Sequence, residues 1–305
     1  MILITGGLGH IGSKLIRELP GNDILIVDSL DTQRYVSLFN LPSNQKFYFI
    51  EYKVQNLTEN SLHKFNSIEA IIHLAAFNET VKYQKKKQEL ESNNLDATNK
   101  IVEIATGLNV PLIFPSSTSV YSGNSNLMTE DVADLNPLNF YAQTKLKEEK
   151  ILNEASKKGL LVKILRLGTV YGTSPGMRFH TAINAFCYRH SIGLPIELWG
   201  SVDDIRPYLS LKDACSSIKF MLNNLNEPSS TYNVATSNSS LKDILMIIES
   251  ISQRKLKIKN INANFAQSNS FSVSTTKIQE LGFEFSGELS TEIAKTLELF
   301  GNIYE

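Results

Sequence analysis

The chain has 305 residues, of which 42% are hydrophobic and 20% charged, and its formal net charge is −1. This length suits one large or two smaller domains with a substantial core. The balanced charge argues against nucleic acid or an anionic membrane as a partner, and no apolar run approaches the ~20 residues of a membrane span. The only cysteines, Cys187 and Cys215, lack metal-ligand spacing. We therefore expect a cytoplasmic protein without a metal site.

The first dozen residues predict a strand, a glycine-rich turn and a helix. The apolar run Ile2–Ile4 leads into Thr5-Gly-Gly-Leu-Gly-His-Ile-Gly12, and a helical pattern covers 12–19. Gly6 and Gly9 permit a tight turn close to a pyrophosphate, and Gly12 permits close packing of the helix on the strand. The free N–H groups at the start of the helix favour phosphate. This context indicates a dinucleotide site that also includes His10 and Ile11. Since the N-terminus is itself a core strand, we expect no cleavable signal.

A carboxylate follows the second predicted strand. Ile24–Val27 is apolar, and Asp28 comes directly after it, sixteen residues past Gly12. An acid at this place accepts hydrogen bonds from the adenosine ribose and repels a 2′-phosphate, which favours NAD over NADP. The alternative is that Asp28 is only a helix cap or turn residue.

Strand-like and helical segments alternate through the first half of the chain. Further strands are predicted at 47–50, 70–74, 112–114 and 161–165, and helices near 58–65, 80–107 and 139–158. This alternation predicts an α/β fold, a Rossmann-type doubly wound parallel sheet with helices on both faces. The regularity fades after about residue 170. We therefore expect an NAD-binding domain over 1–170 and a smaller C-terminal substrate-binding cap over 171–305. Strands between 206 and 235, with Tyr232–Val234 and Phe220 as candidates, are expected to return to the first domain.

Three side chains suit the oxidation of an alcohol. Tyr141 and Lys145 are four residues apart at the start of a predicted helix, hence on one face, and Ser117 follows a predicted strand. A free tyrosine has a pKa of ~10 and is a poor base at neutral pH. A nearby ammonium and the positive nicotinamide ring both favour the phenolate. Tyr141 could then take a proton from a sugar hydroxyl, while Ser117 orients that oxygen. The alternatives are that Tyr141 and Lys145 form only a pair on the surface and that Ser117 only caps the end of a strand.

Together these motifs resemble the extended short-chain dehydrogenase/reductases, in particular the NAD-dependent epimerase/dehydratase family that acts on nucleotide sugars. Further motifs that carry the resemblance are His73-Leu-Ala-Ala76, Asn94 with Thr98, Ser116-Ser117-x-x-Val-Tyr121, Arg166-Leu-Gly-x-Val-Tyr-Gly172, Arg206-x-Tyr208 and Tyr232-Asn-Val234. The resemblance implies NAD contacts from Leu74, Ala75, Ala76 and Asn94. It also implies a nucleotide-diphosphate sugar in the cap and a homodimer through helices near 80–107 and 139–158.

The residues after the catalytic hydroxyl bear on the reaction. Family members that remove water place an Asp-Glu pair there, decarboxylases place Glu at the second position, and 3,5-epimerase/reductases place Cys at that position. This chain has Thr118 and Ser119. Two hydroxyls are typical of 4-epimerases, because no acid–base pair is present for elimination.

The expected substrate contacts combine matches to the family with departures from it. Arg206 matches the arginine that binds the substrate diphosphate, although a surface salt bridge is the alternative. Thr169 stands where the family has an asparagine that contacts the same group. The segment 174–180, which includes Arg178, and the nearby Asn184 resemble a subgroup from surface-polysaccharide pathways, some of which handle heptose nucleotides.

These inferences favour an NAD-dependent nucleotide-sugar 4-epimerase. The first alternative is a C4-dehydrogenase or 4-ketosugar reductase with the same Ser117, Tyr141 and Lys145. The second is a non-catalytic, NAD-binding regulatory protein. The sugar and the nucleotide base are left open by the sequence.

Overall fold

The computed structural model describes residues 1–19, 21–65, 67–78, 87–121, 127–132, 135, 137–261, 270–301 and 303. Its main feature is a seven-stranded, fully parallel sheet in the order β11-β7-β5-β4-β1-β2-β3. The strands are β1 (Ile2–Thr5), β2 (Ile24–Asp28), β3 (Phe47–Glu51), β4 (Ala70–His73), β5 (Leu112–Ser117), β7 (Val162–Leu167) and β11 (Ser230–Val234). The predicted doubly wound α/β fold is confirmed.

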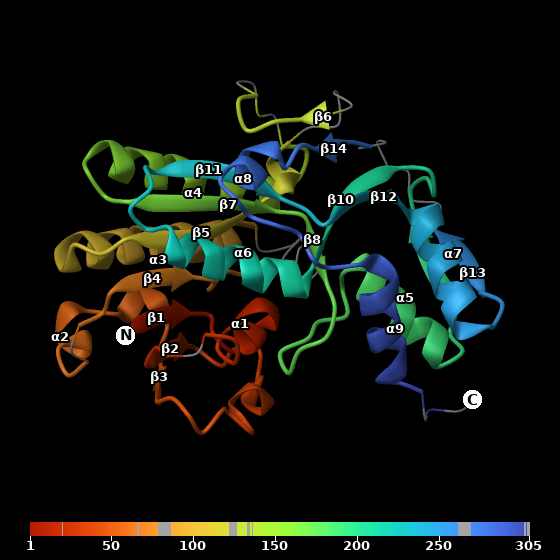
Figure 1. Ribbon diagram of the computed structural model, residues 1–305, viewed down its shortest axis with the longest axis horizontal. Coiled ribbons are helices and arrows are strands. Elements are labelled where there is room, and N and C mark those ends of the chain that lie inside the picture. Colours follow the sequence, from red (N-terminus) through yellow and green to blue (C-terminus); the bar gives the residue numbers. More distant parts are fainter. Residues whose placement is uncertain are drawn as a thin grey trace.

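Alternate side chains of the strands serve two separate cores. Ile2 and Ile4 of β1 lie in a cluster with residues of α1 (His10–Leu15) and α6 (Leu211–Asn223). Leu3 lies in a second cluster with residues of α3 (Lys87–Leu108) and α4 (Phe140–Lys157). Because successive strand side chains point to opposite faces, burial of both sets requires helices on both sides of the sheet. Figure 1 shows this three-layer arrangement.

A smaller part of the chain forms the cap to the right of the main sheet in Figure 1. Its core joins α5 (Ala182–Ser191), α7 (Leu241–Ser252) and α9 (Leu289–Glu298) with β9 (Ile196–Trp199). The remaining elements are β6 (Leu127–Met128), β8 (Thr169–Tyr171), β10 (Ile205–Ser210), β12 (Ser237–Ser240), β13 (Ile258–Ile261), β14 (Ser272–Val273), α2 (Glu59–Leu62), α8 (Thr276–Glu280) and the 3-10 helices η1 (Tyr35–Leu38), η2 (Val54–Asn56) and η3 (Thr118–Val120).

The segment 206–235 divides between the two parts. Tyr232–Val234 lies in β11, at the edge of the main sheet, while β10 pairs with β8 and β12 in a separate three-stranded sheet. Phe220 lies in α6 rather than in a strand. Apolar residues of this segment recur at helical spacing and pack on the main sheet from Ala214 to Met221, which explains the helix.

The helix predicted over 12–19 differs from the observed α1, and the helix predicted over 58–65 is shorter in the structure, where α2 covers Glu59–Leu62. The first starts at His10 and ends at Leu15. The Ile16 N–H still bonds four residues back, to Gly12, but those of Arg17 and Glu18 bond three residues back in tighter turns. Of the helix predicted over 80–107, residues 80–86 lie outside the described residues, and the rest lies in α3.

Candidate active site

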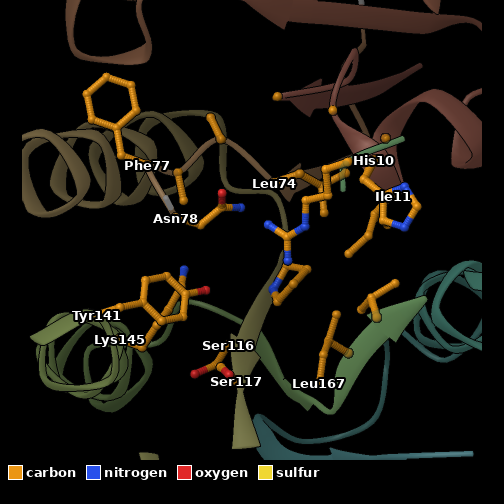
Figure 2. A pocket seen from close by; sticks show the side chains of 18 of the residues that line it. His10, Ile11, Leu74, Phe77, Asn78, Ser116, Ser117, Tyr141, Lys145 and Leu167 are labelled. Atoms are coloured by element: carbon orange, nitrogen blue, oxygen red, sulfur yellow. The ribbon is translucent and has the colours of Figure 1, made fainter. Parts of the chain in front are cut away.

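One cavity of about 530 Å³ runs along the carboxyl ends of the strands. The strand order reverses between β1 and β4, since the chain moves from β1 outward to β3 and then returns to the other side of β1. Open α/β sheets bind ligands at such a point. The cavity wall contains the predicted residues Gly6, Gly9, His10, Ile11, Gly12, Asp28, Leu74, Ala75, Ala76, Ser117, Thr118, Ser119, Tyr141, Lys145, Thr169, Arg178 and Arg206. Figure 2 shows His10, Ile11 and Leu74 across the cavity from Ser117, Tyr141 and Lys145.

The glycine loop tolerates no side chain at its closest approaches. Gly6 has φ +66°, and a Cβ there would lie 2.6 Å from the backbone nitrogen of Ala75. A Cβ on Gly12 would lie 2.7 Å from the carbonyl oxygen of Gly6. Neither contact is sterically possible, so both positions require glycine. The two glycines thereby let the loop pack tightly against the end of β4 and on α1, while Gly6, Gly9 and Gly12 also line the cavity, as a pyrophosphate site requires.

Asp28 organises this loop from the end of β2. Its Oδ2 accepts the Leu8 N–H at 3.0 Å, and its Oδ1 accepts the Leu30 N–H at 3.0 Å. The carboxylate therefore fixes the loop and also gives the cavity a negative charge at the place where a ribose is expected. The hydrogen bond from Leu30 N–H fits the turn interpretation of Asp28, and its contact with a ribose stays a prediction.

A second segment covers the glycine loop from the cap side. The hydroxyl of Ser174 donates to the His10 carbonyl at 2.9 Å, and the Gly176 N–H donates to Ser13 Oγ at 2.9 Å. A Cβ on Gly176 would lie 2.4 Å from the carbonyl oxygen of Leu8. Burial, together with the charges of Arg178, Arg34 and His180, lowers the pKa of His10 to about 3, so this imidazole is neutral.

Ser117 ends β5 in a short hydroxyl cluster. Its Oγ accepts the Ser119 N–H at 3.2 Å and the Ser119 hydroxyl at 2.9 Å. By accepting the Ser119 N–H, the Ser117 side chain caps the start of the 3-10 helix η3. Thr118 is buried beside it and also lines the cavity. No carboxylate takes part in this cluster among the described residues.

Tyr141 and Lys145 reach the cavity from the first turns of α4. Asn139 caps this helix by accepting the Ala142 N–H at 2.9 Å, which fixes where the helix begins. Figure 2 shows both side chains directed into the cavity from the same helix. Lys145 Nζ lies 4.4 Å from the centroid of the Phe114 ring and 3.1 Å from Glu148 Oε2.

Two of the predicted contacts lie behind the cavity wall. Asn94 is fully buried, and it accepts the Phe77 N–H at 2.8 Å and donates to the Phe77 carbonyl at 3.1 Å. Asn184 is fully buried too, where it accepts the Gly172 N–H at 3.0 Å and donates to the Arg178 carbonyl at 3.1 Å. Each amide holds a backbone segment beside the cavity in place, and neither residue is among those that line the cavity.

The structure also adds residues that the motifs did not identify. Phe271 and Pro207 line the substrate side, and the Phe271 ring lies 5.9 Å from the Arg206 guanidinium carbon. Asp31, Arg34 and Lys53 line the far end beyond Asp28. Phe271 stands in an irregular segment with no motif, and only the tertiary structure brings it to the cavity.

The sequence profile of the NAD dependent epimerase/dehydratase family matches residues 2–235. The chain belongs to this family. It is 30% identical over 249 residues to the ADP-L-glycero-D-manno-heptose-6-epimerase of Brachyspira hyodysenteriae, with 78% of this chain and 77% of that protein covered.

Two solved structures are similar over nearly the whole chain. MoeE5 in complex with UDP-glucuronic acid and NAD has a TM-score of 0.84 and 26% identity, and 97% of each chain is covered. A UDP-glucose 4-epimerase has a TM-score of 0.86 and 25% identity, with 100% of this chain and 99% of that one covered. Membership of the family confirms the predictions of an enzyme and of NAD as its cofactor.

Proposed function

We propose that this family member is a nucleotide-sugar epimerase that acts by transient oxidation at C4 of the sugar. The observation that carries the proposal is one continuous cavity, whose wall includes both the glycine loop and, across from it, Ser117, Tyr141 and Lys145. Bound NAD⁺ supplies the oxidising power for a sugar alcohol. The rest of the chemistry falls to the side chains around it.

Tyr141 is proposed as the base. Its phenolic oxygen takes the proton of the C4 hydroxyl and later returns it to the same oxygen. The Lys145 ammonium favours the phenolate form by its charge, and Ser117 Oγ holds the sugar oxygen by a hydrogen bond. Thr118 and Ser119 offer hydroxyls alone, and an elimination would require an acid there. The site is thus suited to reversible alcohol–ketone chemistry.

The cap side is proposed to hold the rest of the substrate. Arg178 and Arg206 line the cavity there together with Thr169. Guanidinium groups are suited to a diphosphate because of their planar, multiple N–H donors. The similar protein MoeE5 has been solved with UDP-glucuronic acid, whereas the heptose epimerase named above carries ADP in its name. We therefore propose the substrate as a nucleoside-diphosphate sugar and leave its base and sugar to the test.

A second candidate has a specific observation in its favour. The relative with 30% identity is named as a 6-epimerase, so the same residues could serve a carbon other than C4. A C4-dehydrogenase or 4-ketosugar reductase would also use Ser117, Tyr141 and Lys145. These alternatives differ in which carbon exchanges its hydrogen and in whether the cofactor is reduced overall.

Labelled substrates distinguish these possibilities. We would screen UDP-, ADP-, GDP-, CDP- and dTDP-sugars, including UDP-glucuronic acid, and then deuterate the converted sugar at C4 or at C6. A 4-epimerase inverts C4, shows a primary isotope effect from deuterium at C4, keeps that label on both epimers and accumulates no NADH. Inversion at C6, with an isotope effect from deuterium at C6, would replace the C4 assignment by the second candidate. A 4-keto product with stoichiometric NADH would instead establish a dehydrogenase.

The assembly and the setting of the enzyme are part of the same proposal. We propose a cofactor-binding part over 1–170 with β11, and an interleaved substrate-binding part over 171–305. We further propose a homodimer through α3 and α4 and a cytoplasmic role in surface-polysaccharide synthesis. In the described part of the chain, no helix is both long and apolar enough to cross a membrane. Light scattering on the purified protein tests the dimer.

A further inference from the structure

A buried acid lies against the lysine of the proposed site. Lys145 is only 4% exposed, and Glu148, one turn later in α4, is fully buried. Glu148 Oε2 lies 3.1 Å from Lys145 Nζ. The other oxygen, Oε1, accepts the Thr98 hydroxyl of α3 at 3.0 Å. Two helices therefore hold this carboxylate beside the ammonium.

The neighbouring Glu149 also adds negative charge near Lys145, but it has a cation of its own. It accepts the Arg166 guanidinium at 2.7 Å and the Ser116 hydroxyl at 2.5 Å, so its charge is balanced within its own network. Glu148 Oε2, by contrast, has no hydrogen-bond donor among the described residues. Its close contact is the ionic one with Lys145. A buried carboxylate without this cation would carry an uncompensated charge, which is strongly unfavourable.

The groups around Lys145 explain why such a partner is needed. Tyr141, Glu148 and Glu149 face it from α4, the Phe114 ring from β5 and His73 from β4. Burial, followed by the charge of Lys145, lowers the pKa of His73 to about 3, so His73 brings no charge. Burial by itself lowers the pKa of Lys145, but the charges of Glu148 and Tyr141 oppose it, and the pKa stands above its ordinary value.

We propose that Glu148 is a positioning residue for the reaction, whose buried carboxylate keeps Lys145 protonated and fixes its ammonium in the site. This inference rests on the proposed function, because it gives Lys145 its role beside Tyr141. Without Glu148, the buried ammonium would be free to lose its proton at a pH at which the native enzyme retains it. Lys145 would then no longer favour the phenolate of Tyr141.

The substitution Glu148→Gln removes the charge and keeps both the size and the acceptor for Thr98. We expect the alkaline limb of turnover, and of NAD⁺ affinity measured by calorimetry, to move down by roughly two pH units or more, since an unpaired buried lysine deprotonates readily. Thr98→Val is the matched control. It removes the hydrogen bond but not the charge, so its alkaline limb should stay at the wild-type position. An E148Q limb that also coincides with that of the wild type overturns the proposal.

Stability gives a readout that needs no ligand. The deficit of E148Q in unfolding free energy should shrink as the pH rises, because the unpaired lysine becomes neutral, whereas a loss of packing alone would cost the same at every pH. If E148Q does not fold, Glu148→Asp takes its place, with an alkaline limb that should lie below the wild-type one. If Tyr141→Phe is inactive but the alkaline limb of E148Q coincides with that of the wild type, this inference is refuted and the proposed function stands. A fully active Tyr141→Phe refutes the proposed function itself.

Discussion

At the scale of single residues, the site combines groups that bond to the backbone with groups left available to a ligand. The side chains of Asp28, Asn94 and Asn184 all accept hydrogen bonds from backbone N–H groups near the cavity. Tyr141 and Lys145 instead face the open space. Removal of the first kind should disturb loops, while removal of the Tyr141 hydroxyl should disturb chemistry without disturbing the fold.

Tyr141→Phe is the sharpest test at this scale. It keeps the ring on α4 and removes the oxygen that would accept the substrate proton. We expect turnover to fall by ~100-fold or more, which is the typical contribution of a positioned base. Folding and NAD⁺ affinity should be retained, as measured by circular dichroism and calorimetry. Tyr188→Phe, a half-exposed tyrosine of α5 outside the cavity wall, is the control and should keep wild-type turnover. Normal turnover of Tyr141→Phe would remove the residue from the mechanism.

At the scale of elements, the glycine loop of the sheet and a loop of the cap are interlocked. The segment that follows β8 reaches back over α1, with hydrogen bonds from Ser174 and Gly176. Asn184 of α5 fixes the same segment from behind. We therefore expect that a shift of the segment after β8 also shifts the glycine loop, so that the two sides of the cavity move together.

Gly176→Ala tests this interlock. The added methyl group would lie 2.4 Å from the Leu8 carbonyl oxygen and 2.5 Å from that of Gly9, so one of the two loops must shift. Overpacking of this kind costs about 1–3 kcal/mol. We expect NAD⁺ affinity to fall by about tenfold or more, as measured by calorimetry. Gly301→Ala, whose Cβ would meet the Glu298 carbonyl oxygen at 3.3 Å and which does not line the cavity, serves as the control. Equal losses in both variants would show that the interlock does not shape the site.

At the scale of the whole molecule, the sheet buries polar groups that report on pH. His73 at the end of β4 is 2% exposed, with its Nδ1 2.6 Å from Thr5 Oγ1. Burial also holds the pKa of His10 at about 3. Both histidines are thus neutral in the folded protein at any pH well above this value. In the unfolded chain they take up protons near pH ~6.5.

Stability should therefore decrease as the solution is acidified from about pH 6.5. Between the folded pKa of about 3 and the unfolded value, the unfolded chain binds more protons, so acid favours unfolding. Each such histidine contributes a slope of up to about 1.4 kcal/mol per pH unit. His73→Asn should reduce the slope of unfolding free energy against pH by about that amount, as measured by urea denaturation. Ile72→Val in the same strand should lower the whole curve without altering its slope. An unchanged slope in His73→Asn would contradict the buried, neutral state.

The sequence by itself determined the sheet and the part of the cavity wall that lies at the strand ends. This part of the cavity wall is built from the ends of strands, and each of these strands is an apolar run in the sequence. Gly6, Asp28 and Ser117, which stand at or directly after such runs, could therefore be located from local pattern alone. The helical spacing of Tyr141 and Lys145 likewise placed both side chains on one face. These features depend on neighbours within a few residues, which is why local sequence is sufficient for them.

Only the tertiary structure decided the contacts between distant segments. Phe271 reaches the cavity from an irregular region, and Gly176 meets Leu8 across more than half of the chain. Asn94 and Asn184 were predicted to contact a ligand, and in the structure their side-chain amides are hydrogen-bonded to backbone groups behind the cavity wall. The pairing of Glu148 with Lys145 also depends on how deeply α4 is buried against α3. Burial decides whether a polar side chain meets solvent, ligand or backbone, and burial is set by packing across the whole fold rather than by local pattern.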